Sequence, residues 1–145
     1  MSFNETFVVY NYTPSELTLD AGNSKNLNNA WPTTIPAATA TSPGYIQFTQ
    51  SEDIDINPTA IYVLQSDPAI TATLHFYCYG AGFVHVNMTL AYSSTPDFSS
   101  AISETNRVGT PVSESGSNNL SIEDNGNISS RGTATFVIGQ ASVPS

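Results

Sequence analysis

The sequence predicts an all-β protein: a single-domain antiparallel β-sandwich of about eight to nine strands that spans residues 1–145. Three observations support this fold class. Apolar and polar residues alternate with a period of two over several short stretches, and turn-forming residues separate those stretches. No window carries a 3.6-residue apolar stripe long enough for a helix. A chain of 145 residues can bury a single core without a disulfide framework, and its one cysteine cannot form an internal disulfide.

In the first half of the chain, alternation predicts four strands, at residues 3–12, 16–20, 45–50 and 59–65. Thr13-Pro14 supplies the turn between the first two of them. Prolines at positions 32, 36 and 43 exclude a central strand from the intervening segment, because proline cannot donate a ladder hydrogen bond.

Residues 71–92 show the clearest alternation in the chain and predict a hairpin with one buried face. The even positions are apolar on each side of Gly80-Ala81-Gly82, so paired positions must share parity. A three-residue loop at those positions satisfies this condition and predicts the buried pairs Cys78–Val84, Phe76–Val86 and Leu74–Met88. The opposite face then carries the pairs Tyr79–Phe83, Tyr77–His85 and His75–Asn87.

After the hairpin the pattern is weaker. Residues 93–104 read as a polar loop anchored by Phe98 and Ile102, and residues 106–112 read as an edge strand interrupted by glycine and proline. A further loop covers residues 113–118. Asn125-Gly126 after residues 120–124 predicts a type I′ hairpin, and residues 132–139 form the last strand. The predicted core includes Leu74, Phe76, Val84, Val86, Met88 and Phe136.

The charge balance excludes two classes of partner. Twelve acidic residues against three basic ones give a net charge of −9, so the chain has no basic footprint for nucleic acid or for anionic lipid. No apolar run reaches the length of a transmembrane helix. The N-terminus lacks the pattern of a secretory signal peptide, so we expect a cytoplasmic protein or one released by an unconventional route. Five Asn-x-Ser/Thr sequons are expected by chance in a chain so rich in these residues.

Metal binding and catalysis find little support in the sequence. Asp53-x-Asp55-x-Asn57 begins like a calcium loop, but Pro58 occupies the position where that loop requires glycine. His75 and Cys78 have opposite parity on one strand, so they cannot share one metal ion. Cys78 lies on the apolar face, and no Gly-x-Ser-x-Gly nucleophile elbow occurs. We therefore expect a non-enzyme that needs no cofactor and no metal.

The aromatic residues are the candidate binding groups. Trp31 precedes a proline-rich loop, and Tyr77, Tyr79 and Phe83 lie near the hairpin tip. One interpretation is that another element covers these rings. The alternative is that they stack on a sugar or lie at a membrane interface, with the apolar ring inserted and the polar end outward. His75 and His85 share the tyrosine face, so binding to a headgroup phosphate would strengthen as the pH falls.

Three short stretches of the chain carry a family resemblance. They are Val9-Tyr10-Asn11 before Leu17 and Leu19, Trp31 ahead of a Pro-rich loop, and His75-Phe76-Tyr77 followed by Cys78-Tyr79-Gly80. In these stretches the chain resembles the aegerolysins and, more loosely, the small component of binary insecticidal crystal toxins. Tyr77 and Tyr79 stand where that family has tryptophans. The resemblance implies an acidic β-sandwich that recognises sphingolipid-type headgroups, with a larger second protein that supplies the pore.

Three functions therefore stay open. The first is a cytolysin-like protein that binds a neutral or zwitterionic membrane-lipid headgroup through Trp31, Tyr77, Tyr79, Phe83 and the two histidines. The second is a glycan-binding lectin that uses the same aromatic residues among Asn, Ser and Asp. The third is a storage or assembly protein with no small ligand, which the low charge and the long Asn/Ser/Thr-rich loops favour.

Overall fold

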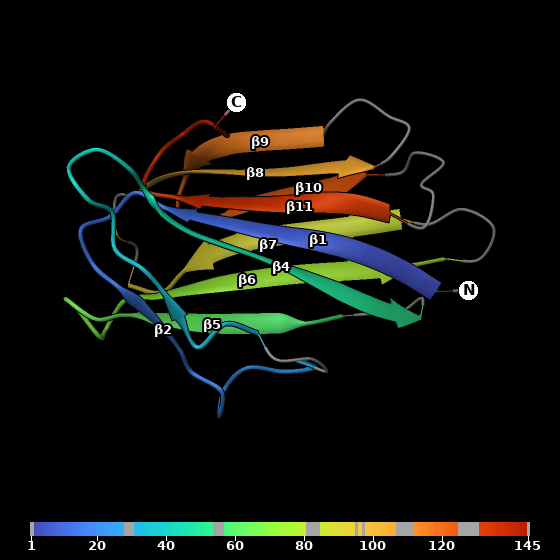
Figure 1. Cartoon of the computed structure of the whole chain (residues 1–145), viewed down its shortest axis with the longest axis horizontal. Helices are drawn as coiled ribbons and strands as arrows, with labels where there is room; N and C mark the ends of the chain where they lie inside the picture. The colour runs from blue at the N-terminus through green and yellow to red at the C-terminus, as the bar shows by residue number, and fades with distance from the viewer. Residues whose placement is uncertain are drawn as a thin grey trace.

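The computed structural model describes residues 2–27, 31–53, 57–80, 85–94, 96, 98–106, 112–124 and 131–144. These residues form eleven strands in two sheets that face each other across one core, and none of them is helical (Figure 1). The all-β prediction is confirmed. The predicted count of eight to nine strands is too low, because residues 34–35, 99–106 and 112–117 form strands without clear alternation.

The first sheet has five strands. Figure 1 shows β1 (blue) beside β11 (red), so strands from the two ends of the chain pair with each other at the centre of this sheet. They run parallel, whereas every other pair of described strands is antiparallel. The spatial order is β4 (Gly44–Asp53), β1 (Ser2–Asn11), β11 (Arg131–Ile138), β8 (Ser99–Asn106) and β9 (Val112–Ser117).

The second sheet has six strands and carries the central hairpin in its middle. Its order is β10 (Leu120–Asp124), β7 (His85–Tyr92), β6 (Thr71–Tyr79), β5 (Thr59–Leu64), β2 (Leu17–Leu19) and β3 (Thr34–Ile35). The two-residue β3 comes from the proline-rich segment and lies at the sheet edge, as expected where proline limits backbone pairing.

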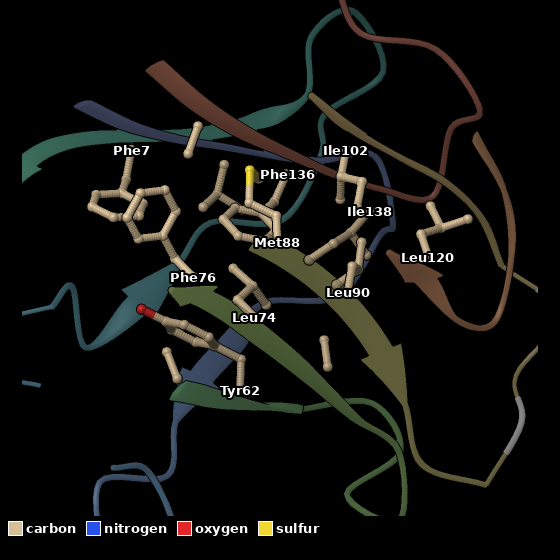
Figure 2. Packing of buried hydrophobic residues seen from close by; sticks show 14 of the residues in the cluster. Phe7, Tyr62, Leu74, Phe76, Met88, Leu90, Ile102, Leu120, Phe136 and Ile138 are labelled. Atoms are coloured by element: carbon tan, nitrogen blue, oxygen red, sulfur yellow. The ribbon is translucent and has the colours of Figure 1, made fainter. Parts of the chain in front are cut away.

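The core fills the space between the inner faces of the two sheets (Figure 2). Phe7 from the first sheet meets Phe76 from the second with ring centroids 5.0 Å apart and ring planes at 80°, an edge-to-face contact. The predicted core residues Leu74, Phe76, Val86, Met88 and Phe136 are all fully buried. Val84, the remaining member of the predicted set, lies outside the described residues.

The hairpin pairs two residues out of the predicted register. Cys78 pairs with Val86, Phe76 with Met88 and Leu74 with Leu90, so the predicted buried pairs are wrong. On the outer face the pairs are Tyr79–His85, Tyr77–Asn87 and His75–Thr89. A slip of two residues keeps every side chain on its face, because the side-chain period of a strand is two. The hydrophobic pattern therefore predicts the buried face correctly but cannot distinguish these two registers.

The segment after the hairpin differs most from the sequence prediction. Residues 99–104, predicted as loop, belong to β8, and residues 113–117, also predicted as loop, belong to β9. β10 pairs with β7, while β11 pairs with β1 and β8. The predicted type I′ turn at Asn125-Gly126 and the return strand from Asn127 lie outside the described residues. The chain crosses between the sheets from β9 to β10 through Asn118, whose φ of 67° lies in the left-handed region that asparagine tolerates.

The contact between Phe7 and Phe76 predicts a large stability loss on truncation. Phe76→Ala should destabilise the fold by about 3–5 kcal/mol through lost apolar burial and the cavity that remains. Chemical denaturation measures the change. Tyr45→Ala is the matched control, because it removes an aromatic ring that is 46% exposed, and it should change the unfolding free energy far less. Equal losses for the two variants would contradict the packing described here.

Candidate functional site

Three rings form a continuous row on the outer face of the six-stranded sheet. Tyr77 and Tyr79 on β6 stack with centroids 4.8 Å apart and planes at 24°. Tyr79 also stacks on His85 of β7, with centroids 5.3 Å apart and planes at 27°. We call these three residues the aromatic row. They are three of the six residues that the sequence predicts as ligand-binding.

The row follows from the alternation of the hairpin strands. Odd-numbered positions of β6 and β7 point away from the core, and the register places His85 directly opposite Tyr79. Directly opposed residues in a sheet have Cβ atoms about 4.5–5.5 Å apart, close enough for rings to stack. β6 ends at Tyr79, and the next residue, Gly80, has a φ of 120° that suits glycine and disfavours other residues.

Polar groups border the row on the β10 side. The Tyr79 hydroxyl donates a hydrogen bond to Oε1 of Glu123, at 3.2 Å. Desolvation first, and then the hydrogen bond to Glu123 and its charge, raise the pKa of Tyr79, while a hydrogen bond with Asn87 opposes that rise. Oδ1 of Asn87 is buried and accepts no hydrogen bond from any described residue. The row thus offers stacked rings beside a carboxylate.

His75 shares the face with the row but has a different role. Its Nε2 lies 2.7 Å from Oδ1 of Asn57, which ties the segment before β5 to β6. Burial lowers the pKa of His75, so its imidazole stays neutral to a lower pH than a free histidine does. The predicted gain in phosphate binding requires a protonated imidazole. His75 would become protonated only at a lower pH than an ordinary histidine does.

Trp31 lies in a loop, as the sequence predicts, but its ring points into the core and is only 4% exposed. It contacts Phe48 and Phe7 with ring centroids 4.8 and 5.3 Å away. The expectation that Trp31 presents its ring to a ligand or membrane from this loop is wrong for this conformation. The reason is tertiary, because its two partners come from β4 and β1, far from it in sequence. Phe83, the remaining predicted residue, lies outside the described residues.

Two features of the surface have no counterpart among the residues that the sequence predicts as ligand-binding. Glu123 contacts the row from a strand whose pairing with β7 was not expected. A second group of rings, Tyr10, Tyr12 and Tyr45, lies where β1 and β4 pair. The ring centroid of Tyr10 is 5.1 Å from that of Tyr45 and 6.5 Å from that of Tyr12. The i, i+2 spacing of Tyr10 and Tyr12 is the sequence signal that could have found it.

A shallow hollow lies on the six-stranded sheet and is lined by Asp20, Asn23, Lys25, Thr59, Ile61 and Thr71. The carboxylate of Asp20 already accepts hydrogen bonds from the backbone and side-chain nitrogens of Asn23. Within the described part of the chain, no three His, Cys, Asp or Glu side chains are arranged to hold a metal ion. Of the calcium-like segment, Asp55 lies outside the described residues, and the Asn57 side chain is bonded to His75.

No family model, curated protein or solved structure matches this chain. The resemblance to the aegerolysins therefore stays a prediction. No helix among the described residues is long and apolar enough to cross a membrane.

The environment of His75 predicts a pH dependence of stability. Because its folded-state pKa is lowered from 6.5, the unfolded chain binds more protons as the pH falls below that value, and acid destabilises the fold. His75→Gln keeps a donor for Asn57 but cannot titrate. Between pH 7 and pH 5 the parent should lose on the order of 1–3 °C more in Tm than the variant does. If the Tm of the parent and that of the variant fall by the same amount between pH 7 and pH 5, the effect is contradicted.

Proposed function

We propose that this protein is a non-enzymatic binding protein that recognises a neutral or zwitterionic headgroup of a membrane lipid, of sphingolipid type, on the outer face of its six-stranded sheet. The observation that carries the proposal is the aromatic row with Glu123 at its side. Tyrosine rings attract an ammonium group through their electron-rich faces, and a neighbouring carboxylate adds a charge contact. Choline and ethanolamine headgroups both carry such a cation.

The charge of the protein favours the same ligand class. With 12 acidic residues against three basic ones, an anionic surface would repel the chain, whereas a headgroup of zero net charge would not. Binding of this kind should also depend weakly on salt, because it releases few counterions.

The described surface favours shallow docking rather than deep insertion. Its exposed large apolar side chains are Tyr45 and Val143, and neither belongs to the row. Trp31, the ring best suited to a membrane interface, is used in the core instead. A protein that only docks on headgroups would need another, larger protein to form a pore, so we include such a partner in the proposal.

Glycan binding is the second candidate, and the polar groups that border the aromatic row favour it. A sugar ring could pack on an end of the aromatic row, as sugars do on tyrosine rings. The Tyr79 hydroxyl and the Glu123 carboxylate add polar contacts of the kind that fix the orientation of a hydroxyl-rich ligand.

Vesicle sedimentation tests the proposal. Vesicles of sphingomyelin, ceramide phosphoethanolamine or phosphatidylcholine, each with and without cholesterol, should be compared with phosphatidylserine vesicles and with a glycan array. We expect binding to at least one zwitterionic lipid, and Tyr79→Ala should weaken it by about tenfold or more, since a buried cation–π contact contributes about 2 kcal/mol. Tyr77→Ala should act in the same direction.

Tyr45→Ala is the control for this experiment, because it removes an exposed ring on the other sheet. Thermal melts must show that each variant stays folded. If folded Tyr79→Ala and Tyr77→Ala proteins bind as well as the parent, the row is not the site. Binding to sugars alone would favour the lectin, and no binding to either lipids or sugars would favour a storage or assembly protein. Vesicle leakage caused by this chain alone would contradict the need for a pore-forming partner.

A further inference from the structure

Carboxyl groups from both sheets are buried at one end of the core. Glu5 on β1 and Glu104 on β8 are fully buried in the five-stranded sheet, and Asp124 on β10 is 3% exposed in the six-stranded sheet. A charged carboxylate is costly to bury without a cation or several hydrogen bonds. The described basic side chains do not meet that need, since Lys25 is exposed and the two histidines lie on the outer face.

Glycine at position 132 makes room for the two glutamates. Glu5 lies beside Gly132 in the ladder of β1 and β11, and Glu104 lies beside Ala134 on the other flank of β11. A Cβ atom at Gly132 would come within 2.5 Å of Oε1 of Glu5 and 2.6 Å of Oε2 of Glu104. The two carboxyl groups therefore meet over the missing side chain, and any larger residue at 132 would collide with both.

Apart from each other and Asp124, the carboxyl groups of Glu5 and Glu104 have no hydrogen-bonding partner among the described residues. Desolvation, followed by interaction with Glu104, raises the pKa of Glu5 well above its ordinary value. Desolvation likewise raises the pKa of Glu104, to about 8. The hydrogen bond with Glu5 opposes this rise, and the interaction with Asp124 adds to it. Two adjacent carboxyl groups in such a site retain a proton between them, as coupled acids do.

The neighbouring elements add one more titratable group. Gln50 of β4 pairs with Glu5 and is a neutral amide, and the position of β11 in register with Glu5 is Gly132. On the other sheet, Asp124 is in register with Val86 of β7, and Val86 with Cys78 of β6. The acidic groups that face one another at this end are therefore Glu5, Glu104 and Asp124, with the buried thiol of Cys78 next in register.

We infer that Glu5 and Glu104 form a proton-sharing carboxyl pair that acts, with Asp124 opposite, as a pH-dependent clamp between the two sheets. While the pair holds its proton, the sheets pack closely at this end. When the proton is lost, carboxylates from both sheets repel one another in a medium of low dielectric constant, and the end of the sandwich is destabilised.

The clamp lies under one end of the aromatic row. Asp124 follows Glu123, which bonds Tyr79, and it pairs with Val86, which follows His85. Loss of the proton therefore weakens the packing of the two strands, β7 and β10, that contribute His85 and Glu123 to the outer face. This inference concerns the core and holds whether or not the row binds a lipid.

The direction of the pH effect follows from linkage. The folded protein binds more protons than the unfolded chain between the ordinary glutamate value of 4.5 and the raised folded value, so stability falls as the pH rises through this range. We expect the Tm of the parent to fall on the order of 5 °C from pH 6.5 to pH 8.5. Glu104→Gln keeps the shape of the side chain but cannot ionise, so the Tm of this variant should fall much less over the same pH range. Glu5→Gln should have the same effect.

Two controls separate the clamp from general charge repulsion in an acidic protein. Glu16→Gln removes the same charge from an exposed position and should keep the parental slope. Added salt screens surface repulsion but not a buried pair, so the slope should persist at 1 M NaCl. Carbon-detected NMR titration of the parent provides a test that needs no variant, and we expect a glutamate carboxyl titrating above pH 7. The clamp is refuted if every glutamate titrates below pH 5, or if Glu104→Gln retains the parental slope.

Discussion

The ring contacts of Phe7 hold the two sheets together and determine how the rest of the chain packs. Phe7 meets Phe76 across the core, and it also packs on Trp31 and Phe48, so one side chain joins both sheets and the proline-rich loop. Each of these contacts combines apolar burial with a ring geometry that aromatic pairs favour. Phe7 reaches this position because β1 pairs with β4 on one side and with β11 on the other.

This packing leaves the outer faces of the sheets free for other chemistry. Because side chains alternate along a strand, burial of Phe76 and Cys78 forces Tyr77 and Tyr79 outward. Outside the core, these two rings stack on each other, and Tyr79 also stacks on His85, which gives the aromatic row. The alternation that buries one face of the hairpin therefore also produces the candidate binding surface.

Buried polar groups give the fold two pH dependences of opposite sign. His75 is disfavoured in its charged form by burial, so acid destabilises the protein at that site. Burial also disfavours the charged forms of Glu5 and Glu104. Because these groups become charged when they lose a proton, a rise in pH destabilises the protein at this pair. Stability should therefore be greatest between these two limits, and neither limit is set by the net charge of the chain.

Alternation in the sequence determined which face of each regular strand is buried. Leu74, Phe76, Val86, Met88 and Phe136 are buried as predicted, since period two is a local property of the chain. Tertiary structure alone decided the register of the hairpin, because a slip of two residues preserves that pattern. It also decided the parallel pairing of β1 with β11, the burial of Trp31 and the meeting of Glu5 with Glu104. Each of these joins segments far apart in sequence, and no local pattern records which distant segment a strand or ring will meet.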